Sequence, residues 1–195
     1  DLEFSREINN RYGTADSVTV AYSPAGRLFD PVELQVLERL SEDLLAIGRV
    51  ESVNSILTVP IFGDTPLTGI SEDYLTLLAP ETDLAAAQEE IMTSPIFRNA
   101  LLSPDGETAG IQVGFALDET ARSLVNSRSE LRNLSRAGDA SPEQLAELSQ
   151  VEAEYARYSV QAADRQREMI SEIRATLDRY RDGAQIYLGG APMIA

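Results

Sequence analysis

The side chains available for chemistry in this sequence are carboxylates, hydroxyls and arginines. The 195 residues contain 32 acidic and 16 basic side chains, every basic one is an arginine, and histidine, cysteine and tryptophan are absent. These absences exclude a Ser-His-Asp or Cys-His catalytic site, a zinc site of Cys and His, a Walker lysine, a Schiff base and a disulfide. Any activity must therefore use carboxylates, hydroxyls, arginines or backbone groups.

Neighbouring carboxylates are the remaining candidates for an acid/base or metal site. Examples are Glu89 with Glu90, and Glu152 with Glu154. Residues one or two apart on a helix do not face each other, and the sequence has no Asp-x-Asp-x-Asp-Gly calcium loop. We therefore expect no catalytic, metal-binding or cofactor-binding residue, and we expect that the protein is not an enzyme.

The net charge of −16 restricts the choice of partner. Nucleic acids and anionic membrane surfaces are bound through clustered basic residues, which argues against both here. With 43% hydrophobic and 25% charged residues, the composition is that of a globular domain. The chain has no membrane-spanning apolar stretch, no signal-peptide pattern and no initiator Met, and residues 189–195 are apolar. We expect a soluble piece of a longer protein.

Hydrophobic periodicity and breaker residues predict the elements that must position any site. Residues 17–22 and 49–59 are rich in β-branched types and predict strands, and residues 108–117 alternate in polarity. Asp30-Pro31 with Glu33 predicts a capped helix start, and Gly48 predicts the stop of that helix. Residues 60–80 predict a loop, and residues 83–92 predict a helix that Ser94-Pro95 ends. Residues 103–106 predict a turn, which joins residues 100–102 to a predicted strand of 108–117 as a hairpin.

The region from 119 to 182 is dense in Arg, Glu, Gln, Ala and Leu and predicts two helices. The break at residues 137–140 and a capping box at Ser141 and Gln144 divide it into helices of 120–136 and 142–182. The second helix would extend about 60 Å, so we expect that part of the pair projects as a hairpin or that the helix bends. Gly183 ends it, and residues 184–188 predict a last strand.

This order of elements predicts an α+β domain with the split β-α-β arrangement of ferredoxin-like folds and a long helical-hairpin insertion. We expect a single domain over 1–195, with a first half in 1–118, the helical hairpin in 119–182, and the last strand and exit in 183–195. The first and last strands of such folds lie side by side and antiparallel. A domain with adjacent ends is easily inserted into another protein.

Six short stretches, in this order and spacing, resemble a known family. They are Arg11-Tyr12-Gly13 with Asp16-Ser17-Val18; Phe29-Asp30-Pro31; Val53, Ser55-Ile56-Leu57 and Val59-Pro60; Leu101-Leu102-Ser103-Pro104-Asp105-Gly106; Ile170, Ile173-Arg174 and Leu177; and Gly189-Gly190, Pro192-Met193-Ile194. The chain resembles the first periplasmic porter domain of exporters of the resistance-nodulation-division superfamily. The branch is that of lipid and hydrophobe exporters related to the MMPL, hopanoid-transporter and Patched groups.

The resemblance implies a periplasmic loop of a bacterial inner-membrane protein that exports lipids or other hydrophobic or amphipathic compounds. Family members use the proton gradient through acids in transmembrane helices, which lie outside this sequence. The implied partners are a hydrophobic or lipid substrate, the rest of the transporter chain, a second copy in a homo-oligomer, or an accessory periplasmic protein. The alternative is a periplasmic sensor or adaptor domain that binds a partner protein through its helical hairpin.

Two regions are candidates for a functional surface. The helical hairpin is a candidate interaction surface, with Tyr155, Tyr158, Leu131 and Leu148, because a pair of helices buries only one face of each and we expect the tyrosines to be exposed. Its alternative is a self-satisfied pair. The apolar residues of the loop are a candidate hydrophobic path. They are Ile61, Phe62, Leu67 and Ile70. We favour the alternative that this loop folds back on the core.

Overall fold

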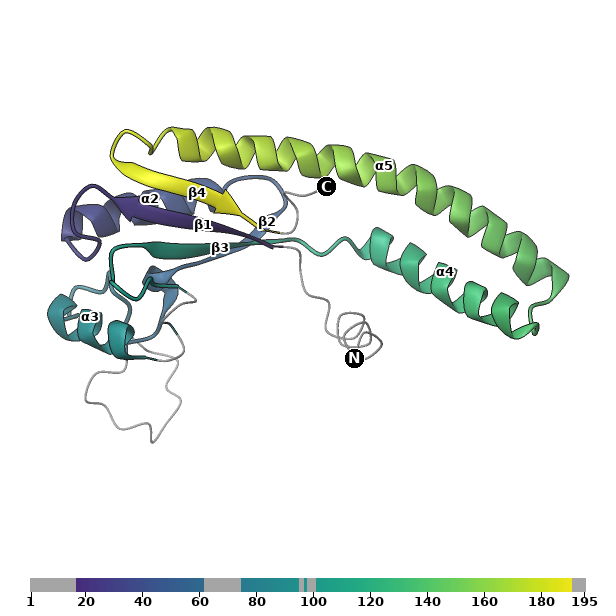
Figure 1. The fold of residues 1–195 in the computed structure, drawn as a ribbon, viewed down its shortest axis with the longest axis horizontal. Coiled ribbons are helices and arrows are strands. Elements are labelled where there is room, and N and C mark those ends of the chain that lie inside the picture. The colour runs from purple at the N-terminus through teal and green to yellow at the C-terminus, as the bar shows by residue number, and fades with distance from the viewer. Residues whose placement is uncertain (1–16, 62–74, 95–96, 98–100, 191–195) are drawn as a thin grey trace. The chain divides into compact units, whose positions relative to one another are not determined.

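A four-stranded antiparallel sheet lies at the centre of a mixed α/β fold in the computed structural model, which describes residues 17–61, 75–94, 97 and 101–190. In chain order the elements are β1 (Ser17–Pro24), α2 (Pro31–Leu45), β2 (Val50–Asn54), the 3-10 helix η1 (Ile56–Thr58), α3 (Leu84–Thr93), β3 (Ala109–Phe115), α4 (Glu119–Ala137), α5 (Pro142–Asp178) and β4 (Ala184–Gly189) (Figure 1).

The described residues divide into two compact units. The sheet unit consists of residues 17–116 and 170–190, and the hairpin unit consists of residues 117–169. Helix α5 begins in the hairpin unit and ends in the sheet unit. None of the helices in the described ranges has the length and apolar composition that are needed to cross a membrane.

The sheet has the strand order β2-β3-β1-β4, and all its neighbouring strands are antiparallel. The register places Val20 of β1 between Ile111 of β3 and Leu188 of β4. Alternate side chains of β1 and β3 are fully or almost fully buried, as the period of two in these strands requires. The expected pairing of the first and last strands is therefore present, since β1 and β4 lie side by side and run in opposite directions.

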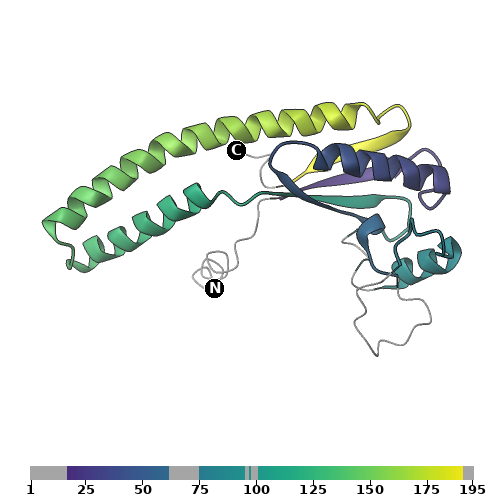
Figure 2. The same cartoon turned by 180° about the vertical axis from the view of Figure 1, so that it is seen from behind.

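Helix α2 lies across one face of the sheet (Figure 2). Its buried stripe consists of Leu34, Leu37, Leu40 and Leu44. Pro31 stands in the first turn as predicted, but the expected capping box is wrong. Asp30 makes no side-chain hydrogen bond at the helix start, and Glu33 accepts a hydrogen bond from the hydroxyl of Tyr22, at 3.2 Å. The buried tyrosine needs an acceptor, and it recruits the carboxylate that would have closed the box.

The last turns of α5 and the turn that follows them belong to the same core. Ile173 and Leu177 have no exposed surface. The hydroxyl of Tyr180 donates to Asp43 of α2 at 2.6 Å, and Arg179 lies 3.2 Å from the same carboxylate oxygen. Burial, and then the hydrogen bond to Asp43, raise the pKa of Tyr180 to about 12. The predicted end of the helix at 182 is wrong, because residues 179–183 form turns after Asp178.

The predicted strand of 49–59 is only half correct. Strand β2 stops at Asn54, and residues 56–58 form η1. Ser55 is buried and accepts a hydrogen bond from the backbone of Leu57, while Thr58 accepts one from the backbone of Ser55. This local capping box outcompetes continued pairing in a segment whose β-branched residues alone favour a strand.

Helix α3 and the turn before β3 agree with their sequence signals. Asp83 caps the start of α3 by accepting from the backbone of Ala85 and Ala86. The predicted turn is closed by a hydrogen bond from the amide of Gly106 to the carbonyl of Ser103, with φ of +76° at Gly106. The expected hairpin is reduced to one bridge, between Leu102 and Ala109. Strand β3 lies between β1 and β2 in the sheet and pairs with both.

The hairpin unit follows its predicted boundaries closely. Asp118 caps α4 by accepting from the backbone of Ala121. Gly138 ends α4 in the left-handed conformation, with φ of +79°. Ser141 and Gln144 exchange hydrogen bonds at the start of α5, which confirms the predicted capping box. The 37 residues of α5 correspond to about 55 Å at the standard rise per residue.

Candidate functional site

The two helices of the hairpin unit are joined by polar and cation-π contacts as well as apolar ones. Leu124 and Leu131 of α4 are buried. Between them in sequence lies Arg128, whose guanidinium carbon is 3.8 Å from the centre of the Tyr155 ring on α5. The Nε atom of Arg128 is buried and has no hydrogen-bond partner among the described residues. A guanidinium stacked on an aromatic ring thus replaces an apolar residue in the contact stripe of α4.

A second contact forms where α4 begins. The Tyr158 hydroxyl donates to the capping residue Asp118 at 2.6 Å, and Arg165 lies 3.8 Å from the other oxygen of Asp118. The guanidinium of Arg165 also lies over the Tyr158 ring, at 5.0 Å from its centre. The hydrogen bond to Asp118 raises the pKa of Tyr158. One carboxylate therefore caps α4 and ties it to α5.

The expectation of exposed tyrosines in the hairpin is wrong. Tyr155 and Tyr158 are both half-buried, and both contact α4. Residues three apart lie on the same side of a helix, so both rings meet the same neighbouring helix. Leu131 is buried and Leu148 is half-buried, so these four residues lie largely within the pair. Whether the hairpin binds a partner stays a prediction, and its surface must be formed by other residues.

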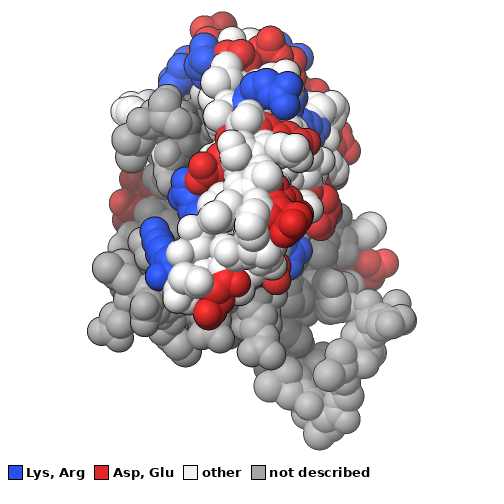
Figure 3. All heavy atoms as spheres, turned by 90° about the vertical axis from the view of Figure 1, so that its right-hand side faces the viewer, with Lys and Arg blue, Asp and Glu red and all other residues white. Residues whose placement is uncertain are grey.

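The outer surface of α5 carries large apolar side chains in water. Val160 is 63% exposed and Leu145 is 47% exposed. Viewed from the side of the hairpin loop, uncharged atoms form a band with acidic and arginine side chains on both sides (Figure 3). The sequence interpretation missed this surface because it followed only the single apolar stripe that faces α4.

Of the candidate hydrophobic path, the structure describes Ile61. Ile61 is buried, and its amide donates to the carbonyl of Leu75 at 2.8 Å. At this residue, the chain therefore folds back on its own core, which is the alternative that the sequence favours. Phe62, Leu67 and Ile70 lie outside the described residues.

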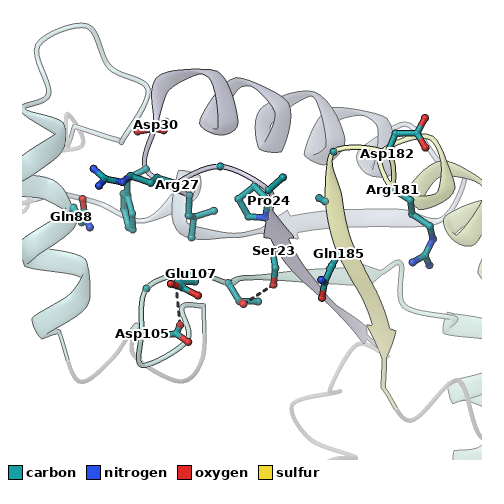
Figure 4. Close-up of a pocket in the computed structure, with 18 residues that line it drawn as sticks. Ser23, Pro24, Arg27, Asp30, Gln88, Asp105, Glu107, Arg181, Asp182 and Gln185 are labelled. Atoms are coloured by element: carbon teal, nitrogen blue, oxygen red, sulfur yellow. Dashed lines mark hydrogen bonds between the residues drawn. The ribbon is translucent and has the colours of Figure 1, made fainter.

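A polar cavity of about 840 Å³ lies at one end of the sheet unit (Figure 4). It is formed by three connections distant in sequence, at residues 23–30, 105–108 and 181–185, together with Gln88. Several polar side chains at its wall already have hydrogen-bond partners. Ser23 and Thr108 share a hydrogen bond of 2.7 Å, and Arg181 bonds Asp178 and the carbonyl of Ile186.

Asp105 at the cavity wall is similarly engaged. It accepts hydrogen bonds from the Ser103 hydroxyl and from the amide of Glu107, and these bonds lower its pKa. Among the described residues, no three Asp or Glu side chains are grouped so that they could hold a metal ion. The cavity therefore offers a polar recess without a set of groups to which a reaction can be assigned. Sequence reasoning could not find it, because its walls come from loops that only the fold brings together.

No protein-family model, no curated protein and no solved structure matches the chain.

Proposed function

We propose that this chain is a ferredoxin-like porter domain with a helical-hairpin insertion, in the periplasmic part of a proton-driven exporter of lipids or other hydrophobic or amphipathic compounds. The observation that carries the proposal is the topology of the sheet. Read from the other edge, its strand order is β4-β1-β3-β2, and α2 and α5 make the two crossovers. This agrees with the split β-α-β arrangement that the element order predicts, and the six sequence stretches of the resemblance give it a functional context.

The ends of the fold suit an insertion between two membrane-spanning helices. Thr19, near the start of β1, lies opposite Gly189 at the end of β4. The chain therefore enters and leaves the sheet at the same place, which lets a domain be inserted without separating the segments that flank it. Energy coupling would belong to acids in the transmembrane helices, and this domain would contribute substrate passage and subunit contacts.

The surface chemistry is consistent with that role. The 32 acidic residues give the domain a strong negative charge, which keeps a protein soluble and disfavours non-specific contact with anionic lipid headgroups. The proposed path for a hydrophobic substrate runs along Ile61, Phe62, Leu67 and Ile70. Because Ile61 is buried, it would support the path rather than line it.

The test uses the full-length protein in membrane vesicles with an imposed proton gradient and a fluorescent lipid analogue as the substrate. Phe62→Asp should reduce transport while the domain stays folded, and Val32→Asp, at a position that is 68% exposed on α2, is the matched control. Transport that is independent of the gradient, or equal in both variants and the parent, would argue against the proposal.

The alternative is a periplasmic sensor or adaptor domain that binds a protein through the hairpin. It is favoured by one observation: the hairpin unit is a separate compact unit with its own caps and contacts between its helices. The sequence that flanks this chain in the intact gene distinguishes the two functions. Many apolar helices and a second copy of the domain support the exporter, whereas one or two apolar helices support the sensor. Deletion of residues 126–160 should abolish partner binding in a sensor.

A further inference from the structure

The outward-facing side of α5 has the pattern of one half of a two-stranded coiled coil. In heptad notation, Ala146, Ala153 and Val160 occupy the a positions, and Ser149, Ala156 and Ala163 occupy the d positions. All six side chains are exposed, although α5 has already packed its other side against α4. We call these six residues the outer seam. It is separate from the contact stripe that includes Tyr155 and Tyr158.

The charges beside the outer seam specify both a partner and an orientation. Glu152 occupies the g position before Ala153, and Arg157 occupies the following e position. In a parallel pair of helices, a g residue faces the e residue five positions later in the partner, so Glu152 of each copy would face Arg157 of the other. The seam is thus complementary to itself in the parallel orientation, and a two-fold axis would repeat the pair of charges.

The charge of the hairpin as a whole is compatible with self-association. Residues 117–169 contain ten acidic side chains and seven arginines, a net charge of −3. In the full sequence, the two segments that belong to the sheet unit are residues 14–116 and 170–195. They contain nineteen acidic side chains and seven arginines, a net charge of −12. Two copies that meet through their hairpins therefore bring together the part of the molecule where repulsion is smallest.

We propose that the outer seam of α5 is a dimerisation surface, on which the same segment of a second copy of this chain packs in parallel. The seam runs from residue 146 to residue 163, about 26 Å of helix at the standard rise. Its small side chains let the two backbones approach closely but bury little apolar area, so the dimer is weak in solution. This proposal does not depend on the exporter function, although copies held in one membrane would have the required parallel orientation.

The absence of cysteine from the sequence makes cross-linking a clean first test. In a parallel dimer each d residue meets its own copy, so Ser149→Cys, Ala156→Cys and Ala163→Cys should each give disulfide-linked dimers under mild oxidation of the whole chain. Glu154→Cys and Gln161→Cys, which are exposed on α5 at b positions and lie off the seam, are the controls and should give about tenfold less. Equal yields at seam and control positions would overturn the proposal. Dimers at only one seam position would show an antiparallel arrangement and would also overturn it.

The charge pattern gives a second test, read in the Ala156→Cys background. Glu152→Arg and Arg157→Glu should each weaken self-association by about tenfold, because like charges then face each other twice. A mixture of the two variants should recover the parental yield as a heterodimer, in which both pairs are again of opposite charge. Glu152 also bonds Arg132 within the hairpin, at 2.6 Å. Recovery in the mixture separates the two effects, since the variant hairpin still lacks that bond, and failure to recover would contradict the assigned contact.

Discussion

Among the described residues of the sheet unit, thirteen apolar side chains have no exposed surface, including Val20, Leu37, Ile111 and Ile173. In the described residues of the hairpin unit, the most buried apolar side chains, Leu124, Leu131 and Met169, keep 7 to 9% of their surface exposed. The hairpin instead uses caps at both helix starts, a cation-π contact and a tyrosine-carboxylate bond. A sheet with helices on one face can enclose a core, whereas two helices alone leave most of their surface in water.

The difference has a consequence for function. Burial of apolar area supplies most of the stability of a folded domain, so the sheet unit has the stronger basis for a rigid frame. The hairpin retains exposed apolar side chains at Leu145 and Val160 and a nearly balanced charge. This contrast is consistent with the proposal that the hairpin unit contacts another molecule while the sheet unit serves as its frame.

The largest expected effect is the loss of stability when a buried side chain is shortened in each unit. Ile111→Ala, in the centre of β3, should lower the free energy of unfolding by about 2 to 5 kcal/mol. Leu124→Ala, at a site that is less completely enclosed, should cost less. Denaturant unfolding with hydrogen exchange resolved by region measures both. An equal cost at the two sites would remove the distinction between the cores.

The second-largest expected effect is a loss of stability of the sheet unit at alkaline pH. The pKa of Tyr180 is raised to about 12, and burial also raises the pKa of Tyr22, with help from the Glu33 charge and hydrogen bond. A tyrosine whose folded pKa exceeds its unfolded value of about 10 stabilises fully below pH 10, and this contribution is lost as the pH rises through the folded pKa. Unfolding measured between pH 9 and 12 should show the loss. Tyr180→Phe should flatten the slope above pH 10, and an unchanged slope would contradict the assignment.

The contact between Arg128 and Tyr155 tests whether a cation-π interaction stabilises the hairpin unit. A double-mutant cycle with Arg128→Met and Tyr155→Leu should show a coupling energy of about 0.5 to 2 kcal/mol. Arg128→Met alone should cost little, because it also removes a buried Nε atom without a hydrogen-bond partner. Additive effects of the two substitutions would mean that the stacking contributes nothing to the hairpin.

The bond between Tyr158 and Asp118 should contribute less. Tyr158→Phe removes the hydroxyl at 2.6 Å from Asp118 and should cost about 1 kcal/mol. Faster hydrogen exchange in the first turn of α4 is the expected signature, because Asp118 also caps that helix. A Phe variant with parental exchange there would indicate that the cap alone orders this end of α4.

The smallest expected effect is at the ion pair between Arg132 and Glu152. Both side chains are more than 40% exposed, and solvent weakens such pairs. Glu152→Gln should change the free energy of unfolding by about 0.5 kcal/mol or less. A larger loss of unfolding free energy would show that this exposed ion pair stabilises the hairpin more than solvent-weakened pairs are expected to.

The local signals in the sequence predicted several elements closely. The Asp30-Pro31 start, the turn at Ser103 to Gly106, the Gly138 stop and the Ser141 and Gln144 capping box are all decided by groups within a few residues of one another. Such signals are legible in one sequence because the atoms that satisfy the backbone are close in the chain. The errors arose where a nearby alternative had an equal claim, as at Ser55, or where a distant residue intervened, as Tyr22 does at Glu33.

The candidate site was less predictable than the fold. Tyr155 and Tyr158 were expected on the surface, but a pair of residues three apart faces the same neighbour once that neighbour is present. The polar cavity was not expected at all, since its walls come from three connections that meet only in the folded sheet unit.

The sequence by itself determined the chemistry that this protein lacks, the helical character of residues 119 to 178 and the caps that divide that region. Composition and local hydrogen bonding decide these properties, and neither depends on distant residues. Tertiary structure alone decided the partners of β3, the use of Glu33 by Tyr22, and which side of α5 is left in water. These depend on contacts between residues far apart in the chain, whose free energy is gained only when the whole core forms.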